Sequence, residues 1–257
     1  MLKKNEINEV SDLLLDFAIS LMGAGSHTAR VVRNIVRVAD ALGYDVDLTM
    51  FQKNVTMMIK DRNSNETFTG VRRIKPMALN FRTISNLSSL SWEAYDQHLS
   101  LDEIKKQYKE IMQTPRLSRW TVLFLVACAN ACFCKLFGGD NYGFILVFIA
   151  TLIGFFVRQE MMNRHMNHFI VFISSAFIAS ITAGVGLIYN IGTTPDIALA
   201  TSVLFLIPGV PLINSIMDML EGYVLAGVSR MINATILIIC ISVGFLMTLL
   251  TLGLEKL

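Results

Sequence analysis

The first 43 residues place their hydrophobic side chains at helical spacing. The first apolar series falls on one face of a helix and consists of Val10, Leu13, Leu14, Phe17 and Leu21. The glycine-containing segment GAGSHT follows, and Ser26 stands where it would cap a second helix that stops at Gly43. This pattern predicts a helical hairpin.

The spacing then changes to the period of two that is typical of β-strands. The segments VDLTMF, NVTMMIK and ETFTGVRRI are rich in β-prone residues and are separated by turn-forming sequence, which predicts about three short strands. Helical spacing returns over residues 79–90 and again from Ser100 to Met112, where Ser100 can cap the helix, before Pro115 breaks the chain. We therefore expect residues 1–119 to form an α+β domain.

Long apolar runs fill the rest of the chain. About 20 mostly apolar residues are needed to cross a hydrocarbon core of about 30 Å. We expect residues 120–257 to form an α-helical bundle of about five transmembrane helices, of which the second is short; the spans are about 120–137, 142–157, 168–189, 196–216 and 230–253.

Charge follows the same division. Residues 1–119 hold 17 of the 22 Lys and Arg and 14 of the 20 Asp and Glu, so the two regions are suited to different solvents. The net charge of +2 and the absence of a basic stripe with interleaved aromatics argue against a nucleic-acid partner.

Basic residues in short loops predict the orientation in a bacterial inner membrane. Arg116 and Arg119 precede the first span, and Arg158 and Arg164 lie between the second and third, whereas the loops GGDN and NIGTTPD carry no basic residue. The N-terminal stretch has acidic residues and lacks the pattern of a signal peptide. We expect the N-terminal domain to be cytoplasmic and the C-terminus to lie outside.

The most informative segment is LIPGVPLINSIMDMLEGYVLAGVSR. Pro208, Gly209 and Pro211 should break the fourth span, and transporters use such broken helices to bind substrates and ions. Asn214 and Asp218 lie one helical turn apart and share a face. The half-helix end would favour a carboxylate, and Asp218 would suit a cation, a proton or an ammonium group.

The same segment also has a plainer interpretation. PGVP is then only a kink that lets helices pack, and Asp218, Glu221 and Arg230 are ordinary residues of a cytoplasmic loop. GAGSHT is interpreted as a structural turn rather than a phosphate cradle, since it lacks the lysine and spacing of a P-loop.

Two segments together carry a resemblance to a known family. GAGSHTARVVRNI, followed by spans whose fourth contains PGVPLINSIMDMLEGYVLAGVSR, resembles the threonine/serine exporter (ThrE-like) family. The motif residues are Pro208, Gly209, Asn214, Asp218, Gly222 and Arg230. Only one set of spans is present, so the chain is most similar to the split form with a YjjP-like larger subunit. That resemblance implies a separate small YjjB-like membrane subunit and export of succinate or of threonine and serine.

We accordingly predict the larger subunit of a secondary exporter for a small carboxylate metabolite, driven by a proton or ion gradient. The alternative is a membrane-anchored ligand-sensing or scaffold protein that acts through its cytoplasmic domain. No nucleotide-binding motif or catalytic constellation is recognisable, so we expect neither an enzyme nor a cofactor. The four cysteines are expected to be free buried thiols, and His165 and His168 to be loop residues rather than metal ligands.

Overall fold

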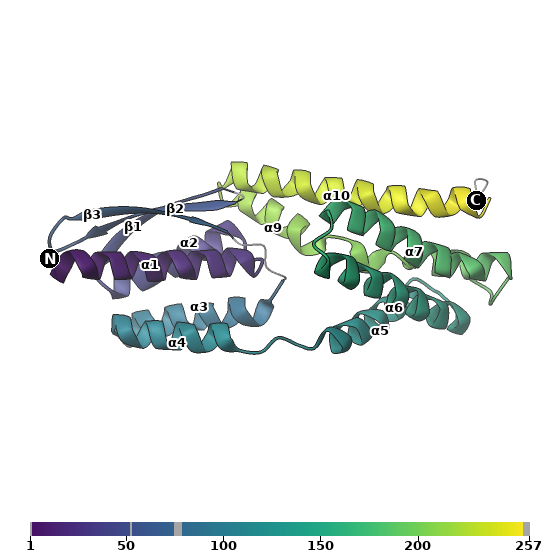
Figure 1. Ribbon diagram of the computed structural model, residues 1–257, viewed down its shortest axis with the longest axis horizontal. Helices are drawn as coiled ribbons and strands as arrows, with labels where there is room; N and C mark the ends of the chain where they lie inside the picture. The colour runs from purple at the N-terminus through teal and green to yellow at the C-terminus, as the bar shows by residue number, and fades with distance from the viewer. Residues whose placement is uncertain (1, 52, 75–78, 254–257) are drawn as a thin grey trace. The chain divides into compact units, whose positions relative to one another are not determined.

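The computed structural model describes residues 2–51, 53–74 and 79–253 (Figure 1). Contacts within the chain define two compact units. The N-terminal unit contains the residues up to Pro115 together with Val210–Ile232, and the apolar unit contains Arg116–Gly209 together with the residues from Asn233 onward. The segment Val210–Ile232, which the division at residue 119 places with the membrane helices, therefore makes its contacts within the N-terminal unit.

The N-terminal unit combines helices with one small sheet. Its first 115 residues form α1 (Leu2–Gly23), α2 (Thr28–Ala41), β1 (Tyr44–Met50), β2 (Asn54–Asp61), β3 (Thr67–Arg73), α3 (Phe81–Asp96) and α4 (Leu101–Gln113). Most of α9 (Gly209–Leu220) and the first residues of α10 (Val224–Thr251) complete it. The expected helical hairpin, three strands and two following helices are all present.

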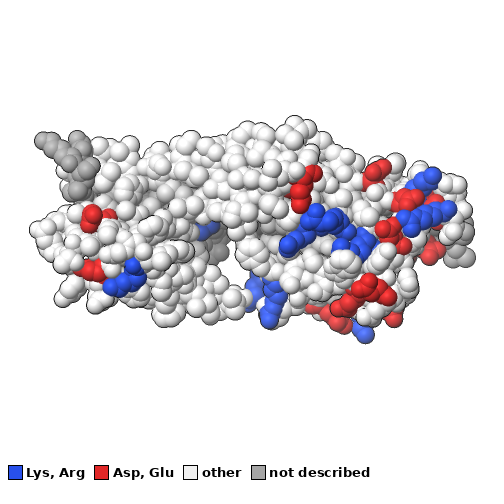
Figure 2. Space-filling view, turned by 180° about the vertical axis from the view of Figure 1, so that it is seen from behind, with Lys and Arg blue, Asp and Glu red and all other residues white. Residues whose placement is uncertain are grey.

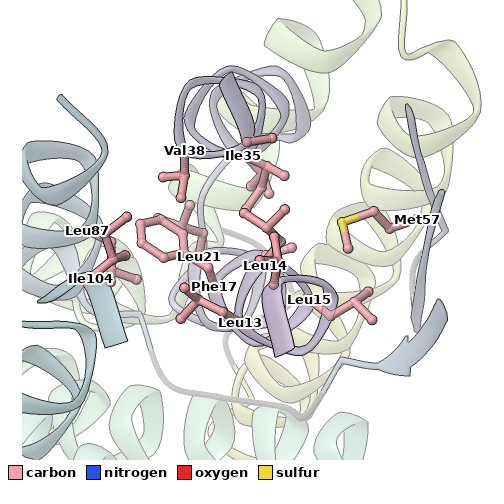
Figure 3. Close-up of a cluster of buried hydrophobic side chains, with 14 of the residues drawn as sticks. Leu13, Leu14, Leu15, Phe17, Leu21, Ile35, Val38, Met57, Leu87 and Ile104 are labelled. Carbon is pink, nitrogen blue, oxygen red and sulfur yellow. The ribbon is translucent and has the colours of Figure 1, made fainter. Parts of the chain in front are cut away.

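The sheet is antiparallel in the order β1-β2-β3 and buries one face. Along β2 the side chains of Val55, Met57 and Ile59 are fully buried, as the period of two predicts. Helix α1 is central to this core. Figure 3 shows its side chains, including Leu14 and Phe17, among residues from the sheet and from α2, α3 and α4.

Local sequence signals set the helix ends in this unit. Ser100 and Glu103 form a capping box at the start of α4, which confirms the expected cap. Asn80 caps α3 by accepting a hydrogen bond from the backbone N–H of Thr83 at 3.2 Å. These caps fix where the two helices begin, and α3 and α4 then pack against α1 through Leu87 and Ile104.

The apolar unit is helical. Its elements are α5 (Arg119–Leu136), α6 (Asn141–Asn163), α7 (His168–Ile188), α8 (Pro195–Thr201), the short 3-10 helix η1 (Leu204–Leu206) and the remainder of α10. Among the described residues, α5, α6, α7 and α10 are each long and apolar enough to cross a membrane. A fifth span is reached if α8 with η1 and the following α9 count as one broken segment.

The expected break in this segment is confirmed. Helix α8 ends at Thr201, Ile207 has extended backbone with φ −59° and ψ 125°, and a new helix starts at Gly209. Pro208 lies at the interruption, where it cannot donate a backbone hydrogen bond. Backbone polar groups freed in this way need partners within the protein.

Small residues bring α6 and α7 close together. A Cβ atom added at Gly154 would lie 2.7 Å from Cβ of Ala179 and 3.2 Å from the carbonyl oxygen of Ser175. Close approach over small residues is typical of helices that pack within membranes, where no hydrophobic driving force brings them together.

Candidate functional site

A tight turn between α1 and α2 provides the first part of the site. Gly25 has φ +95°, a backbone conformation that L side chains rarely adopt, and this explains the second glycine in GAGSHT. The backbone N–H of Ser26 donates to the carbonyl oxygen of Leu21 at 3.0 Å, which closes the turn. The carbonyl groups of Gly25 and Ser26 remain available to other elements.

The N-terminus of α2 is capped by a residue from α9. His27 occupies the N-cap position without a side-chain cap, so the expectation that Ser26 caps this helix is wrong. Instead, Asp218 accepts from the backbone N–H of Thr28 at 2.6 Å and from its hydroxyl group at 3.1 Å. The partners are separated by 190 positions in the sequence. A carboxylate suits this position because a helix N-terminus carries free N–H groups and a partial positive charge.

Arg230 completes a buried ion pair with the same carboxylate. Its Nε lies 3.1 Å from Oδ2 of Asp218, which is fully buried, while the Arg230 side chain is 18% exposed. Its Nη1 donates to the carbonyl oxygen of Ser26 at 3.1 Å. Three donors from two elements therefore hold one carboxylate, and removing either charge would leave the other buried without its partner.

Asn214 binds the same turn from one helical turn earlier in α9. Its Nδ2 donates to the carbonyl oxygen of Gly25 at 2.7 Å. The predicted shared face of Asn214 and Asp218 therefore faces the α1–α2 turn. We call Asn214, Asp218, Arg230 and Thr28 the carboxylate cluster.

A second, more exposed set of charges borders the carboxylate cluster. Glu221 lies 3.4 Å from Arg33 and 3.8 Å from His27. Burial lowers the pKa of His27 below its ordinary value of 6.5, and the Glu221 carboxylate opposes that shift. Such partly exposed ion pairs contribute little to stability, so Glu221 is a suitable control for the buried pair of Asp218 and Arg230.

The turn between α9 and α10 explains the glycine at position 222. Gly222 has φ +89°, and the backbone N–H groups of Gly222 and Tyr223 donate to the carbonyl oxygens of Met219 and Asp218, which is a Schellman motif. Gly222 is exposed, so it shapes the turn and lines no enclosed site. Pro208, Gly209 and Pro211 similarly stand at the start of α9, where they set the helix that carries Asn214 and Asp218.

Gly227 permits the close contact between α9 and α10 on which the ion pair depends. A Cβ atom there would lie 2.6 Å from the carbonyl oxygen of Ser215 and 3.0 Å from the backbone nitrogen of Met219. We expect Gly227→Val to separate the two helices and to lower the free energy of unfolding by about 2 kcal/mol. Thermal unfolding of the purified chain measures this, with Ala226→Val as control, because Ala226 borders a hollow of about 310 Å³. Equal stability of both variants would contradict the packing argument.

The apolar unit contains a buried polar cluster that the sequence analysis missed. Nδ2 of Asn130 donates to Oγ1 of Thr151 at 2.7 Å and to the carbonyl oxygen of Thr201 at 3.2 Å, with that of Ser202 at 3.5 Å. Asn130 thus binds carbonyl groups left free where α8 ends. Its own Oδ1 is buried without a hydrogen-bond partner in the described residues, as is Oγ of Ser175 on α7. The available signal was a lone Asn inside an apolar run.

Two other polar side chains of the apolar unit contact nearby residues. Lys135 donates to Oδ1 of Asn141 at 2.6 Å, and the ring of His168 lies 4.8 Å from that of Phe172. Within the described part of the chain, no group of three or more His, Cys, Asp or Glu side chains is placed to hold a metal ion. The cysteines are free thiols, although Cys132 is exposed rather than buried and Cys128 is only partly buried.

Comparison with known proteins places this geometry in context. The family model of the threonine/serine exporters (ThrE) matches residues 12–252. The chain is 30% identical over 255 residues to a Klebsiella aerogenes protein named "Probable succinate transporter subunit YjjP", covering 98% of this chain and 97% of that protein. It is 31% identical over 249 residues to the Escherichia coli K12 protein of the same name, covering 96% of each.

A more distant relative is longer. The Mycobacterium tuberculosis protein named "Probable threonine/serine exporter" is 24% identical over 252 residues, which cover 94% of this chain but 46% of that protein. No solved structure matches the chain. All three relatives are named as transporters or exporters and none as an enzyme, in agreement with the sequence analysis.

Proposed function

Because the chain belongs to the threonine/serine exporter family, we propose that it is the larger subunit of a secondary exporter for a small carboxylate metabolite. The substrate is a succinate-like dicarboxylate or a threonine-like amino acid, as the names of the relatives suggest. A separate small YjjB-like membrane subunit completes the exporter. One observation supports a partner: the relatives that are similar over nearly their whole length are named as subunits.

The proposed membrane arrangement follows from the helices and the basic residues. Five spans cross the bacterial inner membrane; the fourth is the broken segment that begins with α8 and η1, and α9 continues from it into the N-terminal unit. Arg116, Arg119, Arg158 and Arg164 flank the spans on one side, which is proposed as the cytoplasmic side together with the N-terminal domain. The C-terminus is then outside; its last four residues lie beyond the described part.

The observation that carries the proposal is that Thr28 and Arg230 together bind the Asp218 carboxylate. Thr28 and Arg230 offer the charged and neutral donors that bind a carboxylate. In the described conformation that carboxylate belongs to the protein itself. A substrate carboxylate has the same chemistry and would compete for the same donors.

This competition gives a route to proton coupling. Arg230 requires one negative partner because its guanidinium group is largely buried. When a substrate carboxylate takes that place, Asp218 loses its cation. In this proposal Asp218 then carries the coupling proton, so that the total charge of the cluster is conserved. Asn214 holds the turn that carries Thr28, while Pro208, Gly209, Pro211 and Gly222 set the ends of α9.

Efflux from cells tests the proposed function. Succinate and threonine are measured inside and outside cells that lack this chain, the small subunit, or both. We expect efflux of one of the two solutes to fall at least several-fold when either subunit is missing, and to return only when both are supplied. Unchanged efflux of both solutes in every strain would contradict the proposal.

A further inference from the structure

A groove on the N-terminal unit gathers basic side chains outside the carboxylate cluster. Helices α2 and α3 border a hollow of about 500 Å³. Its basic and polar lining comprises Arg30, Arg33, Asn34, Arg37, Ser85 and Ser88, with Trp92 as an aromatic wall. We call this the arginine groove. Figure 2 shows basic side chains gathered on one face of the protein.

The sequence explains why three arginines share this groove. Arg30, Arg33 and Arg37 are spaced by three and four residues, so all three project from one face of α2. Such crowding of like charges is unfavourable, and none of the described residues that line the groove is a carboxylate. Burial, and after it the positive charge of Arg33, lowers the pKa of Arg37, while the Asp96 carboxylate opposes that shift. An anion in the groove would relieve this repulsion.

The floor of the groove is held in place before any ligand binds. Nη1 of Arg37 donates to Oγ of Ser91 at 2.7 Å and to Oδ1 of Asn34 at 3.1 Å. The same guanidinium group lies 3.5 Å from the ring centre of Trp92. Asn34 in turn donates to Oγ of Ser88 at 3.0 Å. A fixed guanidinium group loses little conformational freedom when it binds an anion.

The other two arginines of the groove, Arg30 and Arg33, are held by fewer contacts than Arg37. Arg30 is exposed, and no side-chain hydrogen bond or ion pair joins it to another described residue. Arg33 is 56% exposed; its guanidinium group lies 3.4 Å from the Glu221 carboxylate and 3.4 Å from Nε2 of His27. One fixed and two adaptable guanidinium groups therefore face the same hollow. Along a helix, positions 30 and 37 are separated by about 10 Å, which is a span that a ligand with two acidic groups can bridge.

We propose that the arginine groove binds a small dicarboxylate. The choice of a dicarboxylate rests on the proposed function, whereas the preference for an anion rests on the groove itself. The volume of the hollow is that of a small-molecule site, and Ser85 and Ser88 add hydroxyl donors beside the charges. A zwitterionic amino acid fits less well, because its ammonium group would face guanidinium groups.

Trp92 provides a direct reporter of binding. The chain has two tryptophans, and Trp120 lies in α5 of the apolar unit. In the full-length Trp120→Phe variant, purified in detergent, fluorescence therefore comes from Trp92 alone. We expect succinate to produce a saturable change that weakens as salt is raised. Threonine should produce none at the same concentration.

Matched variants test whether Arg30 and Arg33 bind succinate. Combining Arg30→Gln with Arg33→Gln should weaken succinate binding at least tenfold. Arg73→Gln, an exposed change on β3, should leave it intact, as should Glu221→Gln, which breaks the same ion pair as Arg33→Gln but keeps the arginine. No saturable change, equal affinity of the double variant, or equal binding of threonine would overturn the proposal.

This binding test is independent of transport. Succinate binding by the purified chain, without efflux in cells, would support the groove while contradicting the proposed function. Efflux that is lost without either subunit, together with no binding at Trp92, would support the exporter while overturning the groove.

Discussion

Asp218→Asn is expected to abolish export. The substitution removes the negative charge that Arg230 and the N-terminus of α2 require, and it removes the only carboxyl group of the carboxylate cluster. Export should fall at least tenfold in the efflux assay. Because Arg230 is then left largely buried without its partner, the free energy of unfolding should also fall by about 3 kcal/mol.

A double variant separates the loss of function from the loss of stability. Combining Asp218→Asn with Arg230→Gln removes both charges, so we expect much of the stability to return while export stays absent. Glu221→Gln is the matched control: it changes an acid three positions away whose ion pairs are partly exposed, and we expect nearly normal export. Normal proton-coupled export by Asp218→Asn would refute the role of this carboxylate.

Asn130→Leu is expected to reduce export at least tenfold with little loss of folded protein. Leucine is close to asparagine in size and favours the membrane, but it cannot bind the carbonyl groups where α8 ends. Hydrogen bonds between membrane helices contribute only about 1 kcal/mol each, so the chain should still accumulate. The interruption between α8 and α9 would then lose the polar contact that holds the end of α8 in place.

The control for this variant is Thr182→Val. Thr182 lies in α7, is partly buried and donates only to a carbonyl group of its own helix, so its loss should leave export nearly unchanged. Efflux and membrane abundance are measured for both variants. Equal export by Asn130→Leu and the wild-type chain would show that the buried amide has no part in transport.

Local signals were sufficient to predict most elements of this fold. Spacing and turn residues predicted the three strands, and Ser100 correctly predicted a capped helix. PGVP correctly predicted an interruption, because proline cannot donate a backbone hydrogen bond. Each of these effects acts over a few residues, which is why a single sequence reveals them.

Contacts between distant residues could not be predicted in this way. The cap of α2 was assigned to Ser26 because it is adjacent, whereas the structure uses Asp218 from 190 positions away. The sequence grouped Asn214 and Asp218 on one face, but nothing in it showed that this face meets the α1–α2 turn. Asn130 was overlooked for the same reason, since its partners come from α6 and α8.

Transport by purified components is the decisive test of a two-subunit exporter coupled to protons. The chain and the small subunit are reconstituted together into liposomes, and uptake of radiolabelled succinate and threonine is followed under an imposed pH gradient. We expect uptake of one solute that requires both proteins and the gradient, and that is lost with Asp218→Asn. Failure of the wild-type pair to move either solute would contradict this expectation.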